Sequence, residues 1–329
     1  MTVGAAFHHV SVLPEETVAG LFTDPDGVYV DCTLGGGGHA AQLAARLSAA
    51  GRLVGIDQDA AAIAAASERL TFAPCRVDIV RDNFRRLEDI LRALAIVDVQ
   101  GFLFDLGVSS PQLDDAARGF SYMQDAPLDM RMDDRAALSA HTVVNAWAEA
   151  ELAHIFKAYG EERWADRIAQ FIVAARREKP VETTGDLVDI IHRAVPAAVR
   201  KAAAGHPAKR VFQAIRIAVN DELGILAEAF RTAVRHLRPG GRLVIITFHS
   251  IEDRIAKNTL RDMARGCICP PDLPVCVCRH RPEIRLLGKV VRPRAEEVAH
   301  NPRAKSAKLR MAEKLSGAQN LREAPEGGA

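Results

Sequence analysis

The chain has 329 residues, of which 48% are hydrophobic and 26% are charged, and its formal net charge is +1. These values exclude a largely disordered chain and leave room for two globular domains. No apolar run is long enough to span a membrane, and the N-terminus lacks the basic start and the apolar core of a signal peptide. We therefore expect a cytoplasmic protein.

A glycine-rich segment joins the first predicted strand to the first predicted helix. Residues 28–30 are apolar and predict a buried strand, and residues 40–47 are good helix formers. Glycine lets the backbone turn tightly and approach a ligand, while the helix N-terminus offers N–H groups and the positive end of the helix dipole. The segment therefore predicts a nucleotide-binding site. Its candidate residues are the strand-ending Asp31 and the glycines Gly35, Gly37 and Gly38.

A second predicted strand, residues 52–57, ends in Asp57 and precedes a helix at residues 60–70. Asp57 follows Gly35 by 22 residues, about where nucleotide-binding folds place a carboxylate on the ribose hydroxyls. Two ligands fit this unit. A dinucleotide fits because Gly35, Gly37 and Ala40 satisfy G-x-G-x-x-A. S-adenosylmethionine (SAM) also fits, with Asp31 and the glycines around its amino-acid part, and the glycines alone do not decide between the two.

Two more strands are predicted at residues 75–79 and 99–107, and the helix between them runs to about residue 94. The second of these strands reaches Asp105 just before a turn rich in serine. Strands that alternate with helices predict a doubly wound parallel sheet, whose ligands bind at the carboxyl ends of the strands. Asp31, Asp57 and Asp105 all lie at such ends, so we expect them to share one site.

The alternation of strands and helices stops after this turn. Between residues 112 and 207 the sequence shows no clear strand, and helices are predicted at residues 149–159, 161–177 and 184–195. We interpret this stretch as an inserted all-α lobe. Thr184 is a candidate cap for the third of these helices.

The sheet is predicted to resume after a long helix at residues 211–237. Arg238-Pro-Gly-Gly241 is expected to end that helix, and residues 242–249 form a fifth strand. Ser250 and Asp253 fit the capping box of the next helix. Two last strands are predicted at residues 283–291 and 308–315.

Seven strands, with Pro-Gly-Gly before the fifth, favour a SAM-dependent methyltransferase fold of the α/β class over a dinucleotide fold. The expected domains are a SAM-binding core, an inserted helical substrate-recognition lobe, the second part of the core, and a disordered tail. Their bounds are residues 1–111, 112–207, 208–315 and 316–329.

Charge is distributed unevenly along the chain. Residues 279–322 carry 12 Lys and Arg against 4 Glu, whereas residues 105–134 carry seven Asp and two Arg. The pattern fits a solvated surface, but it also fits a basic rim around an acidic pocket. The second arrangement would suit a phosphate-rich substrate.

Four of the six cysteines form two C-x-C pairs, Cys267 with Cys269 and Cys276 with Cys278. Zinc sites more often use C-x₂-C. We therefore favour a proline-rich loop with small buried thiols and no metal, and we keep zinc as the alternative.

Motifs along nearly the whole chain carry a resemblance to a known family. They are His8-His-Val-Ser-Val-Leu13, Asp31-Cys-Thr-Leu-Gly-Gly-Gly-Gly-His39, Asp105-Leu-Gly-Val-Ser-Ser-Pro-Gln-Leu-Asp114, Arg118-Gly-Phe-Ser-Tyr122, Phe248-His-Ser-Ile-Glu-Asp-Arg254 and Asn301-Pro-Arg-Ala-Lys-Ser306. With these motifs the chain resembles the bacterial RsmH (MraW) methyltransferases. The resemblance implies a SAM-binding core interrupted by a helical lobe. It also implies methylation of N4 of a cytidine in the decoding centre of 16S ribosomal RNA.

The same resemblance implies roles for single residues. Gly37, Gly38 and His39 would bind the methionine end of SAM, and Asp57 would bind its ribose. Phe84 would lie beside the adenine, although it fits a core aromatic equally well. Asp105 and Gln112 match further positions of the SAM site.

Methyl transfer to an exocyclic amine requires the nitrogen lone pair to be aligned with the methyl group, and a group that accepts a hydrogen bond from the amine. We assign this catalytic role to the turn that contains Asp105, Ser109 and Ser110. The basic residues Arg303, Lys305 and Lys308 are expected to bind RNA. The expected partner is 16S rRNA in the small ribosomal subunit, and the protein would be a monomer or a homodimer.

Three alternatives remain at this stage. An amino methyltransferase acting on DNA or another RNA would accept a different nucleic acid. A nicotinamide-dependent oxidoreductase would bind NAD and transfer no methyl group. A non-enzymatic RNA-binding assembly factor would bind RNA with an affinity that does not respond to SAM.

Overall fold

The computed structural model describes residues 11–202, 205–270, 273, 275, 277, 278 and 280–316, except the side chains of residues 110, 111 and 202. Two compact units are present. One, here called the helical unit, is Val108–Leu223. The other, here called the sheet unit, comprises the described residues of His9–Gly107 and Gly224–Ala329.

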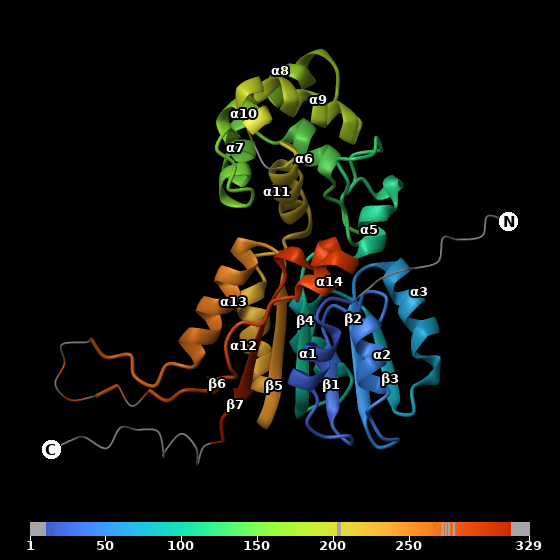
Figure 1. Ribbon diagram of the computed structural model, residues 1–329, viewed down its shortest axis with the longest axis vertical. Helices are drawn as coiled ribbons and strands as arrows, with labels where there is room; N and C mark the ends of the chain where they lie inside the picture. Colours follow the sequence, from blue (N-terminus) through green and yellow to red (C-terminus); the bar gives the residue numbers. More distant parts are fainter. Residues whose placement is uncertain are drawn as a thin grey trace. The chain divides into compact units, whose positions relative to one another are not determined.

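The sheet unit is built on seven strands, as predicted, in the order β3-β2-β1-β4-β5-β7-β6 (Figure 1). The strands are β1 Val28–Asp31, β2 Arg52–Asp57, β3 Arg76–Arg81, β4 Val99–Asp105, β5 Leu237–Thr247, β6 Ile284–Leu286 and β7 Lys308–Lys314. β1 to β5 are parallel, whereas β7 runs antiparallel to both of its neighbours. A dinucleotide-binding sheet has the order 3-2-1-4-5-6. The antiparallel β7 between β5 and β6 therefore separates this fold from the dinucleotide alternative.

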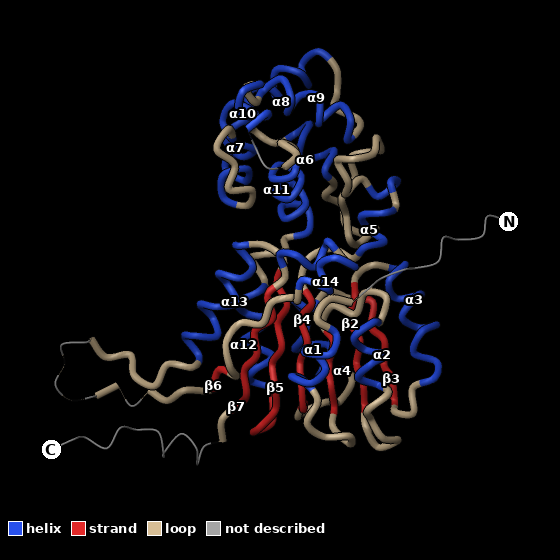
Figure 2. The backbone as a smooth tube through the Cα atoms, viewed as in Figure 1, coloured by secondary structure: helices blue, strands red, loops and turns tan. Residues whose placement is uncertain are grey.

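Helices cover both faces of this sheet (Figure 2). One face packs against α1 Pro14–Leu21, α2 Gly38–Ala44 and α3 Ala60–Arg69. The other face packs against α12 Leu226–His236, which contacts α4 Leu87–Ala93 and α13 Ser250–Met263. Tyr29 and Val244 are buried under the first set, and Phe104 meets Phe230 of α12 edge to face at 5.1 Å. Both faces are thus apolar, as a doubly wound sheet requires.

Shorter elements complete the sheet unit. They are η1 Leu70–Phe72, η2 Phe84–Arg86, α14 Ala295–His300 and η4 Pro302–Ser306. Asn83 caps η2 by accepting a hydrogen bond from the backbone N–H of Arg85, and Asn301 caps η4 in the same way through Arg303. No helix among the described residues is long and apolar enough to cross a membrane.

The helical unit has its own apolar core. Its elements are α5 Ser110–Asp114, η3 Ala116–Arg118, α6 Ala140–Ala146, α7 Glu149–Ala158, α8 Ala165–Glu178, α9 Thr184–Ala194, α10 Ala197–Ala202 and α11 Lys209–Asn220. Phe156, Ile168 and Ile215 are buried together in its centre. In the described part of this unit no strand forms beyond an isolated bridge between Pro127 and Thr183. The prediction of an all-α stretch here is confirmed.

The prediction of one helix over residues 211–237 is wrong. Asp221 has a left-handed backbone, with φ at 48°, and ends α11, while α12 begins at Leu226. The apolar spacing continues across the break, which is why the pattern suggested one helix. Gly240 has a φ of 79°, and the Pro-Gly-Gly residues lie inside β5 beside a register shift against β4. They therefore bulge the strand instead of capping a helix.

Several predicted boundaries also move. His249, and not Ser250, caps α13 together with Glu252, and Thr183, and not Thr184, caps α9 through the N–H of Asp186. α8 begins at Ala165, because residues 160–164 form a turn. β6 ends at Leu286, and Val291 makes only an isolated bridge to Leu309. Adjacent residues can each occupy the N-cap position, so a sequence pattern alone does not determine which of them caps the helix.

Candidate active site

Three aspartates end neighbouring strands of the sheet unit. Asp31 is the last residue of β1, Asp57 of β2 and Asp105 of β4. β1 pairs in parallel with both β2 and β4, so these carboxyl ends meet at one edge of the sheet. The structure therefore confirms that the three acids lie at the edge where doubly wound sheets bind ligands.

Asp57 holds the glycine-rich loop in place. One of its carboxylate oxygens accepts a hydrogen bond from the backbone N–H of Gly35 at 2.8 Å, and the other accepts one from Asp59 at 2.9 Å. Gly37 is the N-cap of α2, and its φ of 74° lies in the left-handed region that favours glycine. The loop that connects β1 to α2 is thus shaped by a residue of β2.

A substitution at Gly37 should reveal this constraint. In Gly37→Ala the new Cβ would lie 3.2 Å from the Cβ of Ala66, on a backbone that L-residues rarely adopt. We expect a loss of about 1–2 kcal/mol in unfolding free energy, the usual cost of a left-handed alanine. Urea unfolding measures it. Gly266→Ala is the matched control, since its Cβ would meet nothing within 4 Å, and an equal loss in both variants would contradict the assignment.

Thr33 links the first and third of these acids. Its backbone N–H donates to Oδ1 of Asp31 at 3.1 Å, and its hydroxyl oxygen accepts a hydrogen bond from the backbone N–H of Asp105 at 2.6 Å. The sequence analysis missed this residue. Its position between the end of a strand and a run of glycines was the available signal.

The buried His39 and the half-buried Asp105 form a pair. Nε2 of His39 lies 3.4 Å from Oδ2 of Asp105, an ion-pair distance at which no well-formed hydrogen bond is made. Among the described residues, neither ring nitrogen of His39 has a hydrogen-bond partner, and neither does Oδ1 of Asp105. Burial opposes a charge on His39, but the carboxylates of Asp105, Asp31 and Glu297 together outweigh it, so the pKa of His39 is raised. Buried polar atoms without partners are costly, and a bound ligand would satisfy them.

The site has more acid than base. Burial raises the pKa of Asp31 to about 7, and the His39 charge only partly offsets this. Burial also raises the pKa of Asp57 to about 6. The backbone hydrogen bonds that its carboxylate accepts lower this pKa, but by less than burial raises it. A ligand that brings positive charge to this edge would favour both carboxylates, because an opposite charge lowers the pKa of an acid.

Phe84 begins η2, at the end of β3, and is half-buried. Its ring meets that of Phe104 edge to face, with 5.5 Å between centroids and an interplanar angle of 88°. Phe104 is fully buried, so Phe84 lies at the margin of the core. This position fits both of the roles considered for it, the core aromatic and the neighbour of a flat ligand.

The profile of the MraW methylase family matches residues 6–315. This chain belongs to the MraW methylase family. Several relatives carry the name ribosomal RNA small subunit methyltransferase H. The relative from Symbiobacterium thermophilum is 54% identical over 318 residues, 96% of this chain and 100% of that protein. The relative from Brevibacillus brevis is 52% identical over 94% of this chain and 99% of its own length, and that from Heliobacterium modesticaldum is 53% identical over the same shares.

In this member of the MraW methylase family, three candidate residues, Ser109, Ser110 and Gln112, belong to the helical unit. The backbone N–H of Ser109 donates to the side-chain oxygen of Gln112 at 3.0 Å, and Gln112 is buried. The backbone N–H of Gln112 approaches the Ser109 hydroxyl at 3.4 Å. These contacts stiffen the turn that follows β4. The side chain of Ser110 lies outside the described part of the chain.

The three basic candidates of this methylase differ in their surroundings. Arg303 and Lys305 are exposed on η4. Nζ of Lys308 contacts Asp253 of α13 at 2.6 Å, beside Nε of Arg310 at 2.8 Å. Burial alone would raise the pKa of Asp253, but these two cations lower it. Lys308 therefore stabilises the packing of β7 against α13, whatever else it contacts.

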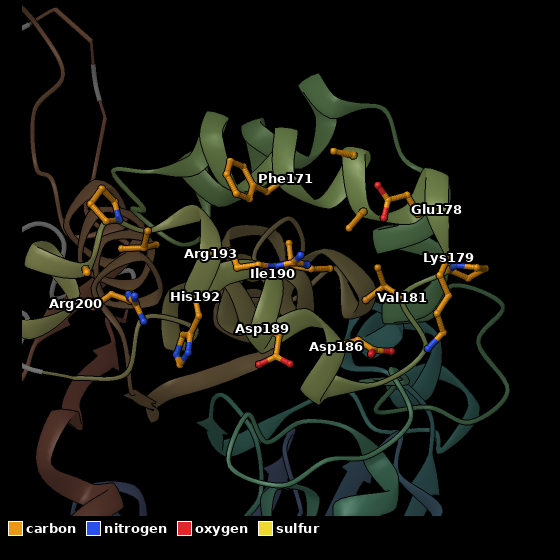
Figure 3. A pocket seen from close by; sticks show the side chains of 16 residues that line it. Phe171, Glu178, Lys179, Val181, Asp186, Asp189, Ile190, His192, Arg193 and Arg200 are labelled. Carbon is orange, nitrogen blue, oxygen red and sulfur yellow. The ribbon is translucent and has the colours of Figure 1, made fainter.

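A groove of about 970 Å³ lies in the helical unit of this methylase (Figure 3). Its walls come from α8, α9 and α10. The charged side chains of the lining are Glu178, Lys179, Asp186, Asp189, Arg193 and Arg200. Acids and bases balance there, so the groove lacks the positive charge that a phosphate backbone would need. None of the three strand-ending aspartates lines it.

Proposed function

We propose that this protein transfers the methyl group of SAM to N4 of a cytidine in the 16S rRNA of the small ribosomal subunit. The observation that carries the proposal is the acidic strand edge, with the unsatisfied His39–Asp105 pair, in a chain of the MraW methylase family. The names of the relatives support small-subunit rRNA as the substrate. The N4 position and the decoding centre rest on the motif resemblance alone.

The residues of the sheet unit fit SAM. Asp31, Gly35, Gly37, Gly38 and His39 would hold its methionine end, because the acidic edge suits its positive charges and the loop offers backbone N–H groups. Each carboxylate oxygen of Asp57 accepts one backbone N–H, from Gly35 or from Asp59. The remaining lone pairs of these oxygens would accept hydrogen bonds from the ribose hydroxyls. Phe84 would cover the adenine. When bound, SAM supplies a methyl group already activated by the positive sulfur.

Asp105 is the residue to which we assign the main catalytic role. Its unpartnered Oδ1 can accept a hydrogen bond from the target amine, which turns the nitrogen lone pair toward the methyl group. His39 positions the carboxylate from the other side. Ser109, Ser110 and Gln112 follow Asp105 in the chain, and we propose that this turn shares the placing of amine and SAM.

The RNA would be held by residues outside the acidic edge. We propose Arg303 and Lys305 as phosphate contacts, because both are exposed on η4. The helical unit would recognise the RNA around the target base, which must leave its stack to be methylated. A substrate in the small subunit also implies a cytoplasmic location, and we propose a monomer or a homodimer as the acting species.

The deciding experiment uses methyl-labelled SAM and small subunits from a strain that lacks this protein. After incubation the 16S rRNA is digested and its nucleosides are separated. We expect label in N4-methylcytidine only. Label in another nucleoside, or label in DNA oligonucleotides at an equal rate, would select the alternative amino methyltransferase. RNA binding without label would select the assembly factor, and binding of NAD without label the oxidoreductase.

RNA binding should depend steeply on salt through η4. Replacing Arg303 and Lys305 by Gln should reduce the slope of log affinity against log salt by about 1–2 units, since each lost phosphate contact removes roughly 0.7–0.9. Filter binding of 16S rRNA measures this slope. The salt concentration is varied from roughly 50 to roughly 300 mM.

Lys308→Gln is the informative companion. It removes the contact with Asp253, so we expect a lower melting temperature. A reduced salt slope in Lys308→Gln with unchanged melting would assign Lys308 to RNA instead of to the fold. An unchanged slope in the Arg303 and Lys305 double variant would show that these two side chains face solvent and do not contact the RNA.

A further inference from the structure

Three cysteine sulfurs converge among the described residues between α13 and β6. They belong to Cys267, Cys269 and Cys278, and all lie within 4.8 Å of one another. Cys276, the fourth cysteine of the pattern, lies outside the described residues. We propose that the three described cysteines bind a zinc ion. The proposal is independent of the methyl-transfer site.

The spacing of the sulfurs matches zinc coordination. Sγ of Cys267 lies 3.8 Å from Sγ of Cys278. Two thiolates bound to one tetrahedral zinc at about 2.3 Å lie about 3.8 Å apart. A disulfide would bring the same atoms to about 2.0 Å. The geometry therefore places these two sulfurs as ligands of one ion and not as a covalent pair.

Backbone N–H groups point at the same sulfurs. Those of Ile268 and His280 donate to Cys278 at 3.5 and 3.4 Å, respectively. Those of Cys269 and Val277 donate to Cys267 and Cys269, each at 3.4 Å. N–H donors favour a thiolate over a thiol, and the thiolate is the form that binds metal. Such donors also orient metal ligands in known sites.

Burial does not explain why the sulfurs gather. Cys267 is exposed, and Cys269 and Cys278 are only half-buried. The neighbouring Ile268 and Val277 are 55% and 71% exposed. For the three described cysteines the expectation of small buried thiols is therefore wrong. A bound ion would hold the two ends of the segment together.

Zinc suits this ligand set chemically. Soft thiolates select zinc over magnesium or calcium, and zinc needs no redox partner. Each thiol that binds releases its proton to solvent, so binding should weaken as pH falls. The three sulfurs leave one position of a tetrahedron for a further ligand.

The test is metal analysis of the full-length protein, purified under reducing conditions without chelator. Mass spectrometry of the digested protein should find about one zinc per chain. Cobalt(II) exchanged into the protein should give the charge-transfer absorption of thiolate ligands. Cys267→Ser and Cys278→Ser should each lose the zinc and this absorption. Cys75→Ser, which changes a cysteine buried elsewhere in the sheet unit, should keep both.

A second measurement guards against misfolding of the variants. SAM binding and the circular dichroism spectrum should be the same in Cys267→Ser as in the wild type, while trypsin should cut the variant faster between residues 265 and 285. Reduced wild-type protein that takes up no zinc from a zinc-buffered solution would overturn the proposal. So would full zinc retention in Cys267→Ser.

Discussion

Asp105→Asn is expected to slow methyl transfer by about 10²-fold or more, the usual scale for a positioned proton acceptor. The amide keeps the size of the side chain but removes its charge and replaces one acceptor by a donor. It also removes the partner that raises the pKa of His39. Since Asp105 ends its strand at the surface of the site, the melting temperature should stay near that of the wild type.

Single-turnover rates at saturating SAM separate two roles of Asp105. A rate that recovers fully at high SAM would make it a SAM ligand only, whereas a rate that stays low places it on the amine. Asp98→Asn is the matched control, because Asp98 is exposed and precedes the other end of β4. Wild-type rates for Asp105→Asn at limiting SAM would remove Asp105 from the mechanism.

SAM affinity is expected to fall steeply as pH drops from about 8 to about 5, a range that extends about one unit beyond the two raised pKa values. Asp31 titrates near 7 and Asp57 near 6 in the free protein. A cationic ligand requires both as carboxylates, so each costs up to about tenfold in affinity per pH unit below its pKa. Protonation of His39 adds a repelling charge and acts in the same direction. Calorimetry in buffers of different ionisation enthalpy should detect protons released on binding at pH 6.

Asp31→Asn tests the same carboxyl through the stability of the fold. The pKa of Asp31 in the folded protein, about 7, lies above its ordinary value of 3.8. Between these values the folded state binds the extra proton, so wild-type stability falls as pH rises through 7. The variant should therefore melt higher than the wild type at about pH 8, by a margin that shrinks as the pH falls toward 3.8, while it binds SAM more weakly at about pH 8. Affinity independent of pH in the wild type would contradict this account.

Parts of the site could be predicted because they depend on local chemistry. The four-glycine loop and the aspartates at the ends of apolar strands are written in short runs of residues. Parallel strands bring their carboxyl ends to one edge, so three local patterns were enough to place Asp31, Asp57 and Asp105 together. The alternation of strands and helices likewise predicted the first four strands.

Other parts needed the folded chain. Asp221 breaks a continuous apolar pattern, since spacing reports which side chains are buried and not where the backbone turns. The pairing of His39 with Asp105 spans 66 residues of sequence, and the bridge from Thr33 to Asp105 spans 72. The convergence of Cys267 with Cys278 depends on a loop whose path no short pattern sets.

The sequence by itself thus determined the strands, the glycine loop and the acids that end the strands. Only the tertiary structure decided which polar atoms of that edge are satisfied by protein and which are left for a ligand. The reason is physical: propensity and periodicity act over a few residues, whereas a hydrogen bond or ion pair between distant residues forms only where packing brings both atoms within about 3–4 Å.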